Sequence, residues 1–128
     1  MILLDTHVWV WWAVDGPKLS KAAKRVLAKT EQKAIADITL WEVAMLCAKG
    51  RLRLDRPVGE WLDQAVEETA VEIVPISAAV ATRSTALGAV FHGDPADQLI
   101  AATALVQGLA LVTADERLRQ FLGIETVW

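Results

Sequence analysis

Short apolar runs alternate along the chain with segments in which apolar residues recur every three or four positions. Each run is only a few residues long and is bounded by turn or capping residues, which is typical of a buried strand. The predicted strands cover residues 2–4, 34–38, 71–76, 109–113 and 124–127. Strands that alternate with helices form a mainly parallel sheet with helices on both faces, so the pattern predicts a three-layer α/β/α fold.

The predicted helices fill the segments between these strands. The clearest covers residues 19–27, where apolar side chains share one face and Lys and Arg occupy the other. The others begin at Thr6, Thr39, Val58, Ser77, Pro95 and Asp115, and they end near Gly16, Lys49, Thr69, Leu87, Val106 and Phe121. We expect Thr6 to be an N-cap, and the spacing of Thr39 and Glu42 predicts a capping box. Thr113 and Glu116 have the same spacing.

Length and composition narrow the class of protein. The chain has 128 residues, of which 54% are hydrophobic, and this composition excludes an intrinsically disordered chain. No apolar run reaches the roughly 18 residues that a membrane-spanning helix needs. The lone cysteine, Cys47, excludes an internal disulfide. We expect one domain over residues 1–128, located in the cytoplasm. The apolar excess favours a surface that faces a partner, and we expect a homodimer.

Basic and acidic residues are distributed unevenly along the chain. Residues 18–56 contain ten Lys or Arg and four Asp or Glu, a net charge of +6. The remaining residues contain three basic and twelve acidic side chains, a net charge of −9. The total of −3 argues against a protein that coats nucleic acid, but it is compatible with a basic face beside an acidic pocket.

Four acidic residues lie at or near the points where predicted strands give way to helices. Asp5 ends the first strand, Glu42 and Asp97 lie in the first turns of helices, and Asp115 follows the fourth strand. In a parallel sheet these junctions share one edge, where ligand sites form. We therefore expect the four side chains to converge.

Each acid taken alone has a structural explanation, because the helix dipole favours acids in a first turn. Asp94, before Pro95, is explained as an N-cap. Together, however, the four acids lie in apolar sequence with no Lys or Arg beside them, and they would raise one another's pKa. A divalent cation removes this repulsion, and oxygen ligands favour Mg²⁺ or Mn²⁺. Such a site is suited to hydrolysis of a phosphodiester.

The chain resembles the PIN-domain ribonucleases, and more closely the toxins of VapBC toxin–antitoxin systems, in three segments. They are LLDTHVWVWW (3–12), ITLWEVAMLCAKGRL (38–52) and HGDPADQLIAATALVQGLALVTADERL (92–118). The resemblance extends over essentially the whole chain, and the motifs occur in the family's order. It implies a compact PIN-like α/β/α fold, metal-dependent endoribonuclease activity on RNA, and a cognate antitoxin that blocks the site.

Carried over by motif, the resemblance assigns the four acids to a catalytic metal site. It implies that Asp5 and Asp97 are the firmest ligands of Mg²⁺ or Mn²⁺. Glu42 and Asp115 are implied to complete the pocket, partly through water. All four acids of the family's pattern are present, so nothing in the motifs marks an inactive relative.

Other polar residues accompany these motifs. The resemblance implies that Thr6 and Thr113 are polar neighbours of the metal ligands. Whether Asp94 is a ligand or only a helix cap stays open. His7 and His92 flank the motifs, and we interpret both as loop or packing residues, because a metal-bound water needs no histidine to lose its proton.

Basic residues near the motifs are candidates for contact with RNA phosphates. Lys49, Arg51 and Arg53 follow the helix that carries Glu42, and we single them out for that role. The basic face at residues 18–29 is interpreted first as a solvated helix face.

Aromatic residues are unusually numerous, since the chain contains six tryptophans. Trp9, Trp12 and Trp41 lie near the motifs, where they either stack on a base, bind an antitoxin helix, or pack in the core or at a dimer interface. Cys47 lies on an apolar helix stripe, and we expect it in the core.

Two other functions compete with the nuclease. A non-catalytic protein-interaction module would use the acids to hold a structural ion. A phosphoacceptor domain of the response-regulator kind has a similar sheet with clustered acids, but it normally has paired acids at the first strand and a lysine near the last. Here Asp5 stands alone and no lysine follows Lys49, which ranks this function last.

Overall fold

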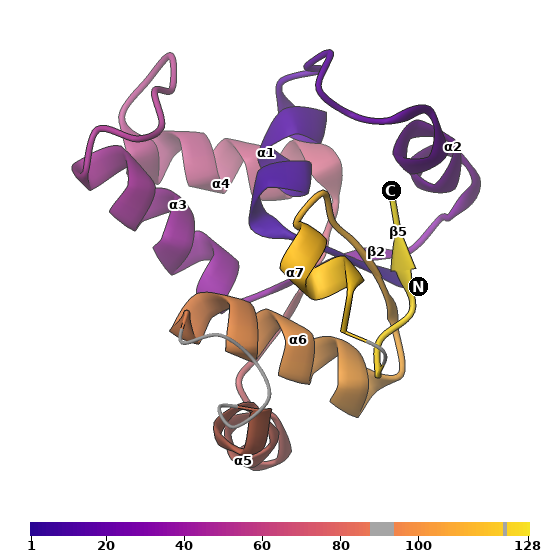
Figure 1. The fold of residues 1–128 in the computed structure, drawn as a ribbon. Helices are drawn as coiled ribbons and strands as arrows, with labels where there is room; N and C mark the ends of the chain where they lie inside the picture. Colours follow the sequence, from indigo (N-terminus) through magenta and orange to yellow (C-terminus); the bar gives the residue numbers. More distant parts are fainter. Residues whose placement is uncertain (88–93, 122) are drawn as a thin grey trace.

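The computed structural model describes residues 1–87, 94–121 and 123–128, so the predicted loop at His92 lies outside the described residues. Helices and strands alternate along most of the chain (Figure 1). In order, they are β1 (Ile2–Leu4), α1 (Thr6–Ala13), α2 (Lys21–Lys29), β2 (Lys33–Ala36), α3 (Ile38–Ala48), α4 (Val58–Thr69), β3 (Glu72–Val74), α5 (Ala78–Ala86), α6 (Pro95–Gln107), β4 (Ala110–Val112), α7 (Glu116–Arg119) and β5 (Thr126–Val127). The predicted alternation is confirmed, although the later strands are shorter than expected.

The strands pair in parallel throughout the described residues. They form one five-stranded sheet in the order β3-β2-β1-β4-β5. At its centre, Leu3 of β1 pairs with Ala34 of β2 and with Leu111 of β4. The chain adds β2 and β3 on one side of β1, and then returns to add β4 and β5 on the other. The carboxyl ends of β1 and β4 therefore form the switch point at which open α/β sheets bind ligands.

Two apolar cores cover the two faces of this sheet. One contains side chains of α1, α2 and α4, and the other contains side chains of α5 and α6. Ile2 and Leu4 of β1 belong to the first core, whereas Leu3 belongs to the second, because successive side chains of a strand point to opposite faces. Figure 1 shows α1, α2 and α4 above the sheet, with α5 and α6 below it. The three-layer α/β/α prediction is confirmed.

The N-cap of α1 and the start of α3 differ from the prediction. Asp5, rather than Thr6, is the N-cap of α1, and its Oδ1 accepts a hydrogen bond from the Thr6 N–H at 2.8 Å. α3 already begins at Ile38, so Thr39 lies inside the helix and the predicted capping box with Glu42 is wrong. The Thr39 hydroxyl is instead 3.1 Å from that of Thr6, which joins α3 to α1. β1 and β2 each pass into the following helix through a single residue, so both helices start at the sheet edge.

α6 contains the most apolar stretch of the sequence. The Asp94 Oδ1 caps its N-terminus by accepting hydrogen bonds from the N–H groups of Ala96 and Asp97, at 3.0 and 3.3 Å. Its other end is Gly108, whose φ of 65° is one that side chains disfavour. No helix within the described ranges is long and apolar enough to cross a bilayer.

Candidate metal centre

A hollow of about 410 Å³ lies at the carboxyl edge of the sheet, and acidic side chains line it. The four acids whose convergence the sequence predicts all contribute to this lining: Asp5, Glu42, Asp97 and Asp115. They come from the end of β1, the second turn of α3, the first turn of α6 and the segment after β4. Asp94, the N-cap of α6, lines the same hollow, which we call the acidic pocket.

Three of these carboxylates lie close enough together to bind one ion. Glu42, Asp94 and Asp97 each offer one oxygen, and these oxygens all lie within 4.8 Å of one another. Glu42 and Asp97 are buried, whereas Asp94 is half-buried. The resemblance to the PIN nucleases implied Asp5 and Asp97 as the firmest ligands. The three clustered carboxylates include Asp97 but contain Asp94 instead of Asp5. Asp94 is therefore both a helix cap and a neighbour of two buried acids of the pocket.

Asp5 is held in one orientation by hydrogen bonds to both of its carboxylate oxygens. The Thr6 N–H donates to Oδ1 at 2.8 Å, and the Thr113 hydroxyl donates to Oδ2 at 2.7 Å. The same Thr113 oxygen accepts a hydrogen bond from the Asp115 N–H at 3.0 Å. Thr113 thus connects the ends of β1 and β4, and it lies where the sequence predicts a polar neighbour of the acids.

An arginine that sequence reasoning missed reaches two of the acids. Nη2 of Arg117 is 3.4 Å from Oδ2 of Asp115 and 3.8 Å from Oδ2 of Asp97. Asp115 also caps α7, because its Oδ1 accepts a hydrogen bond from the Arg117 N–H at 2.8 Å. The predicted capping box of Thr113 and Glu116 is therefore wrong. The expectation that the acids have no basic neighbour is also wrong, since Arg117 is only two positions from Asp115.

The pocket changes the pKa values of its acids in different directions. Burial, followed by the charges of Asp94 and Asp5, raises the pKa of Asp97 to about 8. Burial also raises the pKa of Asp5 and of Glu42, although hydrogen bonds from threonines oppose it at both positions. At Asp115 the effect of burial is outweighed by hydrogen bonds from Arg117, so its pKa falls.

The donor set fits a hard divalent cation. Carboxylates that repel one another in a partly buried pocket gain most from a cation that compensates their charge. Oxygen ligands of this kind are preferred by Mg²⁺ and Mn²⁺, whereas zinc and copper sites draw on His and Cys. Glu42, Asp94 and Asp97 would hold such a cation, with Asp5 and Asp115 beside them.

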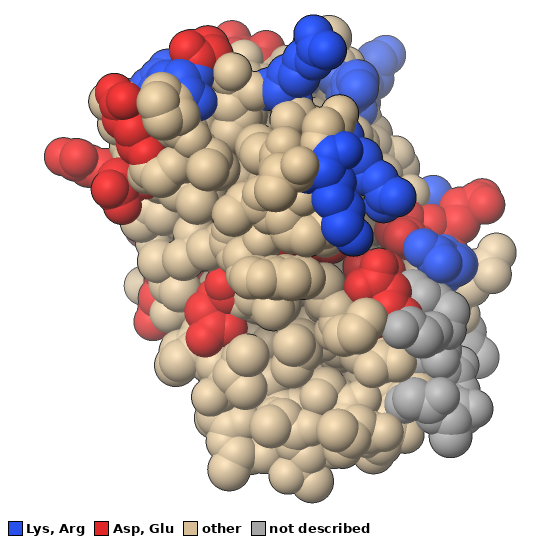
Figure 2. All heavy atoms as spheres, turned by 90° about the vertical axis from the view of Figure 1, so that its left-hand side faces the viewer, with Lys and Arg blue, Asp and Glu red and all other residues tan. Residues whose placement is uncertain are grey.

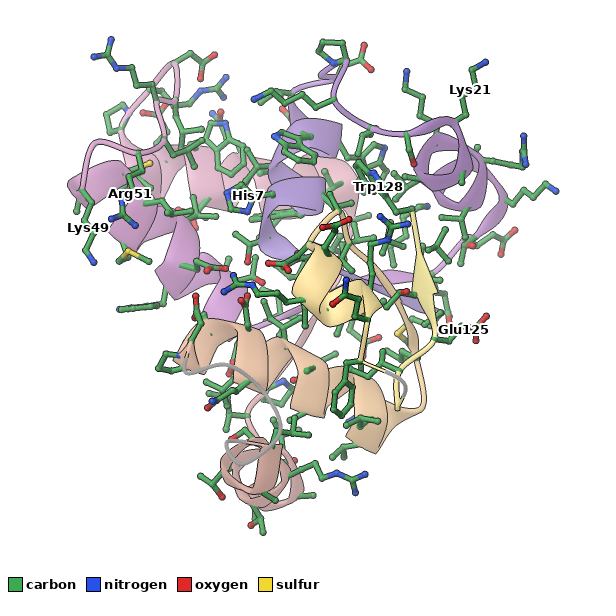
Figure 3. All side chains as sticks on the ribbon, viewed as in Figure 1. His7, Lys21, Lys49, Arg51, Glu125 and Trp128 are labelled. Carbon is green, nitrogen blue, oxygen red and sulfur yellow. The ribbon has the colours of Figure 1, made fainter. Side chains whose placement is uncertain are left out.

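The predicted RNA-contact residues separate in the structure. Arg51 lines the acidic pocket, whereas Arg53 lines a different hollow beside Asp55 and Arg56. Lys49 is exposed at the end of α3, close to Arg51 (Figure 3). Figure 2 shows the side of the molecule that is on the left in Figure 1. Lys and Arg side chains gather over its upper part, where they border acidic side chains, and its lower half is mostly uncharged.

The tryptophans have distinct roles, and sequence reasoning missed the one nearest the acids. Trp9 is buried in the core and donates a hydrogen bond through Nε1 to Thr69 at 3.1 Å. Trp12 is half-buried and Trp41 is exposed. Trp11, which was not singled out, lines the acidic pocket. Helical spacing alone did not fix which of two adjacent tryptophans turns toward the acids.

Two further expectations concern a histidine and the cysteine. His7 is exposed and lines the acidic pocket, so it is not a packing residue. Cys47 is half-buried and belongs to neither apolar core, so its expected place in the core is wrong. His92 lies outside the described residues.

Comparisons with known proteins agree with this geometry. The sequence profile of the PIN domain matches residues 2–122. Ribonuclease VapC22 of Mycobacterium tuberculosis is 43% identical over 118 residues, which are 92% of this chain and 89% of the relative.

Solved structures show the same fold. A toxin–antitoxin complex from Klebsiella pneumoniae contains a chain with 26% identity and a TM-score of 0.68, covering 97% of this chain and 95% of that one. In DNA-bound VapBC from Salmonella typhimurium, the similar chain has 23% identity and a TM-score of 0.70, with coverage of 98% and 97%. The second likeness shows the fold alone. With a profile match over nearly its whole length and a relative at 43% identity, the chain belongs to the PIN domain family.

Proposed function

We propose that this protein is an endoribonuclease dependent on Mg²⁺ or Mn²⁺ and the toxin of a type II toxin–antitoxin system. The observation that supports this most strongly is the acidic pocket, in which Glu42, Asp94 and Asp97 lie within reach of one ion. The relative named ribonuclease VapC22 and the solved toxin–antitoxin complex support the substrate class and the antitoxin partner.

The acidic side chains have separate roles in this proposal. Asp5, Glu42, Asp97 and Asp115 would hold the cation, as the resemblance implies, and Asp94 would join them. A divalent cation bound there would supply an activated water and stabilise negative charge on the phosphoryl oxygen. Thr113 keeps the Asp5 carboxylate oriented toward the pocket through its 2.7 Å hydrogen bond. Arg51 contacts the RNA backbone at the pocket's edge.

The assembly and location of the protein remain part of the same proposal. A protein antitoxin neutralises the toxin by occupying or blocking the acidic pocket. We also propose a homodimer in the cytoplasm. Trp41 is exposed on α3 and is available to such an interface.

A cleavage assay on total cellular RNA tests the activity. The purified chain, free of any partner, is assayed in Mn²⁺, in Mg²⁺ and in a chelator, and the extent of RNA cleavage is compared. We expect metal-dependent cleavage that Asp97→Asn abolishes and that Asp63→Asn retains, because Asp63 is an exposed acid on α4 outside the acidic pocket.

Two other outcomes would change the conclusion. Cleavage that persists in Asp97→Asn would contradict the assignment of the pocket. A folded protein that is stabilised by Mn²⁺, cuts no RNA and causes no growth arrest on expression would instead be the non-catalytic binding module.

A further inference from the structure

Two aromatic rings stand at the side of the acidic pocket. His7 and Trp11 both line it, and both project from α1, one helical turn apart. Their ring centroids are 5.9 Å apart, with planes tilted by 50°. His7 is exposed, whereas Trp11 is half-buried. Trp11 also packs against the first apolar core, so the pair presents aromatic surface to the pocket from a ring that the core supports.

His7 is near the acids as well as near Trp11. It lines the same pocket as Asp5 and Glu42. Figure 3 shows His7 on the side of α1 that is turned toward α3, and Arg51 lies just beyond the end of α3 on the same side of the molecule. The aromatic pair consequently borders the acids on one side, and Arg51 lines the same pocket.

Trp11 is positioned by contacts on its other sides. Its ring centroid is 5.9 Å from that of Trp128, and Nζ of Lys18 is 5.7 Å from the ring centroid. These contacts limit the motion of the indole, which reduces the entropy that a ligand must remove when it stacks there. Lys18 also places positive charge beside the Trp11 ring, and a Lys side chain can contact a phosphate of a nucleic-acid backbone.

We propose that His7 and Trp11 form a stacking platform for one unpaired base of the RNA substrate, next to the phosphodiester that would be cleaved at the acidic pocket. This inference rests on the proposed nuclease function and adds to it a way of positioning the strand. Every base has a π-face, so such a platform holds single-stranded RNA without choosing a sequence. Arg51 and Lys18 would contact the flanking phosphates.

The chain provides a matched control on the same helix. Trp12 follows Trp11 directly, is also half-buried, and also has a lysine over its ring, with Nζ of Lys33 5.2 Å from the centroid. Trp12 lines a different hollow, beside Asp15 and Leu19, and not the acidic pocket. Replacing Trp12 therefore repeats the loss of an indole and a cation contact without touching the platform.

The test measures binding of two fluorescent oligonucleotides in chelator, so that neither is cut. One is a short single-stranded uridine oligonucleotide, and the other has the same length and charge but lacks bases at its central positions. We expect Trp11→Leu to weaken binding of the first by about fivefold or more, and to leave binding of the second unchanged. Trp11→Phe should keep most of the affinity, His7→Leu should act like Trp11→Leu, and Trp12→Leu should bind as the wild type does.

Several results would overturn the platform. In one, Trp11→Leu loses the same affinity for both oligonucleotides. In the others, the wild type binds the two oligonucleotides equally, or it binds neither. Thermal melting of each variant identifies a folding defect. If Trp11→Leu does not fold, the affinities of Trp11→Phe for the two oligonucleotides are compared with those of the wild type. Metal-dependent cleavage by the wild type and its loss in Asp97→Asn test the nuclease separately, so failure of one proposal is distinguishable from failure of the other.

Discussion

Burial raises the pKa of the Asp97 carboxyl group, and so do the charges of four other acids, Asp94, Asp5, Asp115 and Glu42. Its pKa of about 8 lies far above the 3.8 of an unperturbed aspartate. Between these two pH values, the metal-free native state keeps a proton that the unfolded chain has lost. The free energy of unfolding therefore falls as the pH rises through this window.

This effect predicts that the metal-free protein melts at a lower temperature at pH 8 than at pH 5. Asp97→Asn should flatten this dependence and melt higher than the wild type at pH 8, because an amide does not ionise. Each kcal/mol recovered corresponds to roughly 4 °C in Tm. Mn²⁺ should stabilise the wild type more at pH 8 than at pH 5, since the cation competes with protons. Parallel melting curves for the variant and the wild type across this range would contradict the raised pKa.

Asp94 has two separable roles, and a pair of substitutions distinguishes them. Asparagine caps helices as well as aspartate does, whereas alanine loses the cap at a cost of about 0.5–2 kcal/mol. We expect both Asp94→Asn and Asp94→Ala to bind Mn²⁺ at least about tenfold more weakly, measured by calorimetry. Only Asp94→Ala should melt at a lower temperature. An asparagine variant with wild-type affinity for Mn²⁺ would show that Asp94 is a cap alone.

Sequence reasoning could predict a site residue where its place along the backbone is enough to bring it to the pocket. Asp5 and Asp115 follow strands that share one sheet edge, so their convergence follows from the parallel topology. Trp11 and Arg117 were missed, because each depends on the direction of a side chain. The rotation of α1 turns Trp11 rather than Trp12 to the acids, and the Arg117 guanidinium folds back onto Asp97.

At the scale of elements, single hydroxyl groups connect the strand ends to the helices around the pocket. Thr113, which is fully buried, donates to Asp5 and accepts from the Asp115 N–H, and so it links β1, β4 and α7. The Thr6 and Thr39 hydroxyls, 3.1 Å apart, make a similar link between α1 and α3. These links fix the geometry of acids that come from separate elements.

Thr113→Val keeps the shape of the side chain and removes its hydroxyl, leaving two groups without their partner. Each unsatisfied group costs about 1–3 kcal/mol, so the melting temperature should fall by roughly 4 °C or more. Losing the hydrogen bond to Asp5 also raises the pKa of that carboxyl further, so Mn²⁺ should bind more weakly near neutral pH. Thr113→Ser should restore most of the cation affinity. A serine variant as weak as the valine variant would show that packing, and not the hydroxyl, positions Asp5.

Element types were easier to predict from the sequence than element starts. Apolar runs and helical stripes identify the alternation of strands and helices, because burial of whole elements determines it. Capping patterns assigned the wrong caps to α1, α3 and α7, since Thr6, Thr39 and Thr113 all have the residue type of an N-cap. In the folded chain their hydroxyl groups bond to each other and to Asp5 instead, through contacts between elements that no local pattern contains.

At the scale of the whole molecule, the fold brings part of a basic segment to an acidic site. Residues 18–56 have a net charge of +6, and the loop after α3 carries several of these charges. The fold divides that loop, so that Arg51 lines the acidic pocket while Arg53 lines the hollow beside Asp55 and Arg56. Net charge along the sequence therefore overstates the number of basic groups available to a strand in the pocket.

This division predicts how binding of single-stranded RNA depends on salt. Each phosphate contact contributes about 0.7 to the slope of the logarithm of the association constant against the logarithm of salt concentration. Arg51→Ala should reduce that slope by about 0.7 and weaken binding of all sequences alike, whereas Arg53→Ala should leave it unchanged. Anisotropy titrations in chelator over a series of salt concentrations provide the measurement. If both variants reduced the slope equally, the strand would follow the whole loop from Arg51 to Arg56, and the acidic pocket would be only one part of a longer RNA-binding surface.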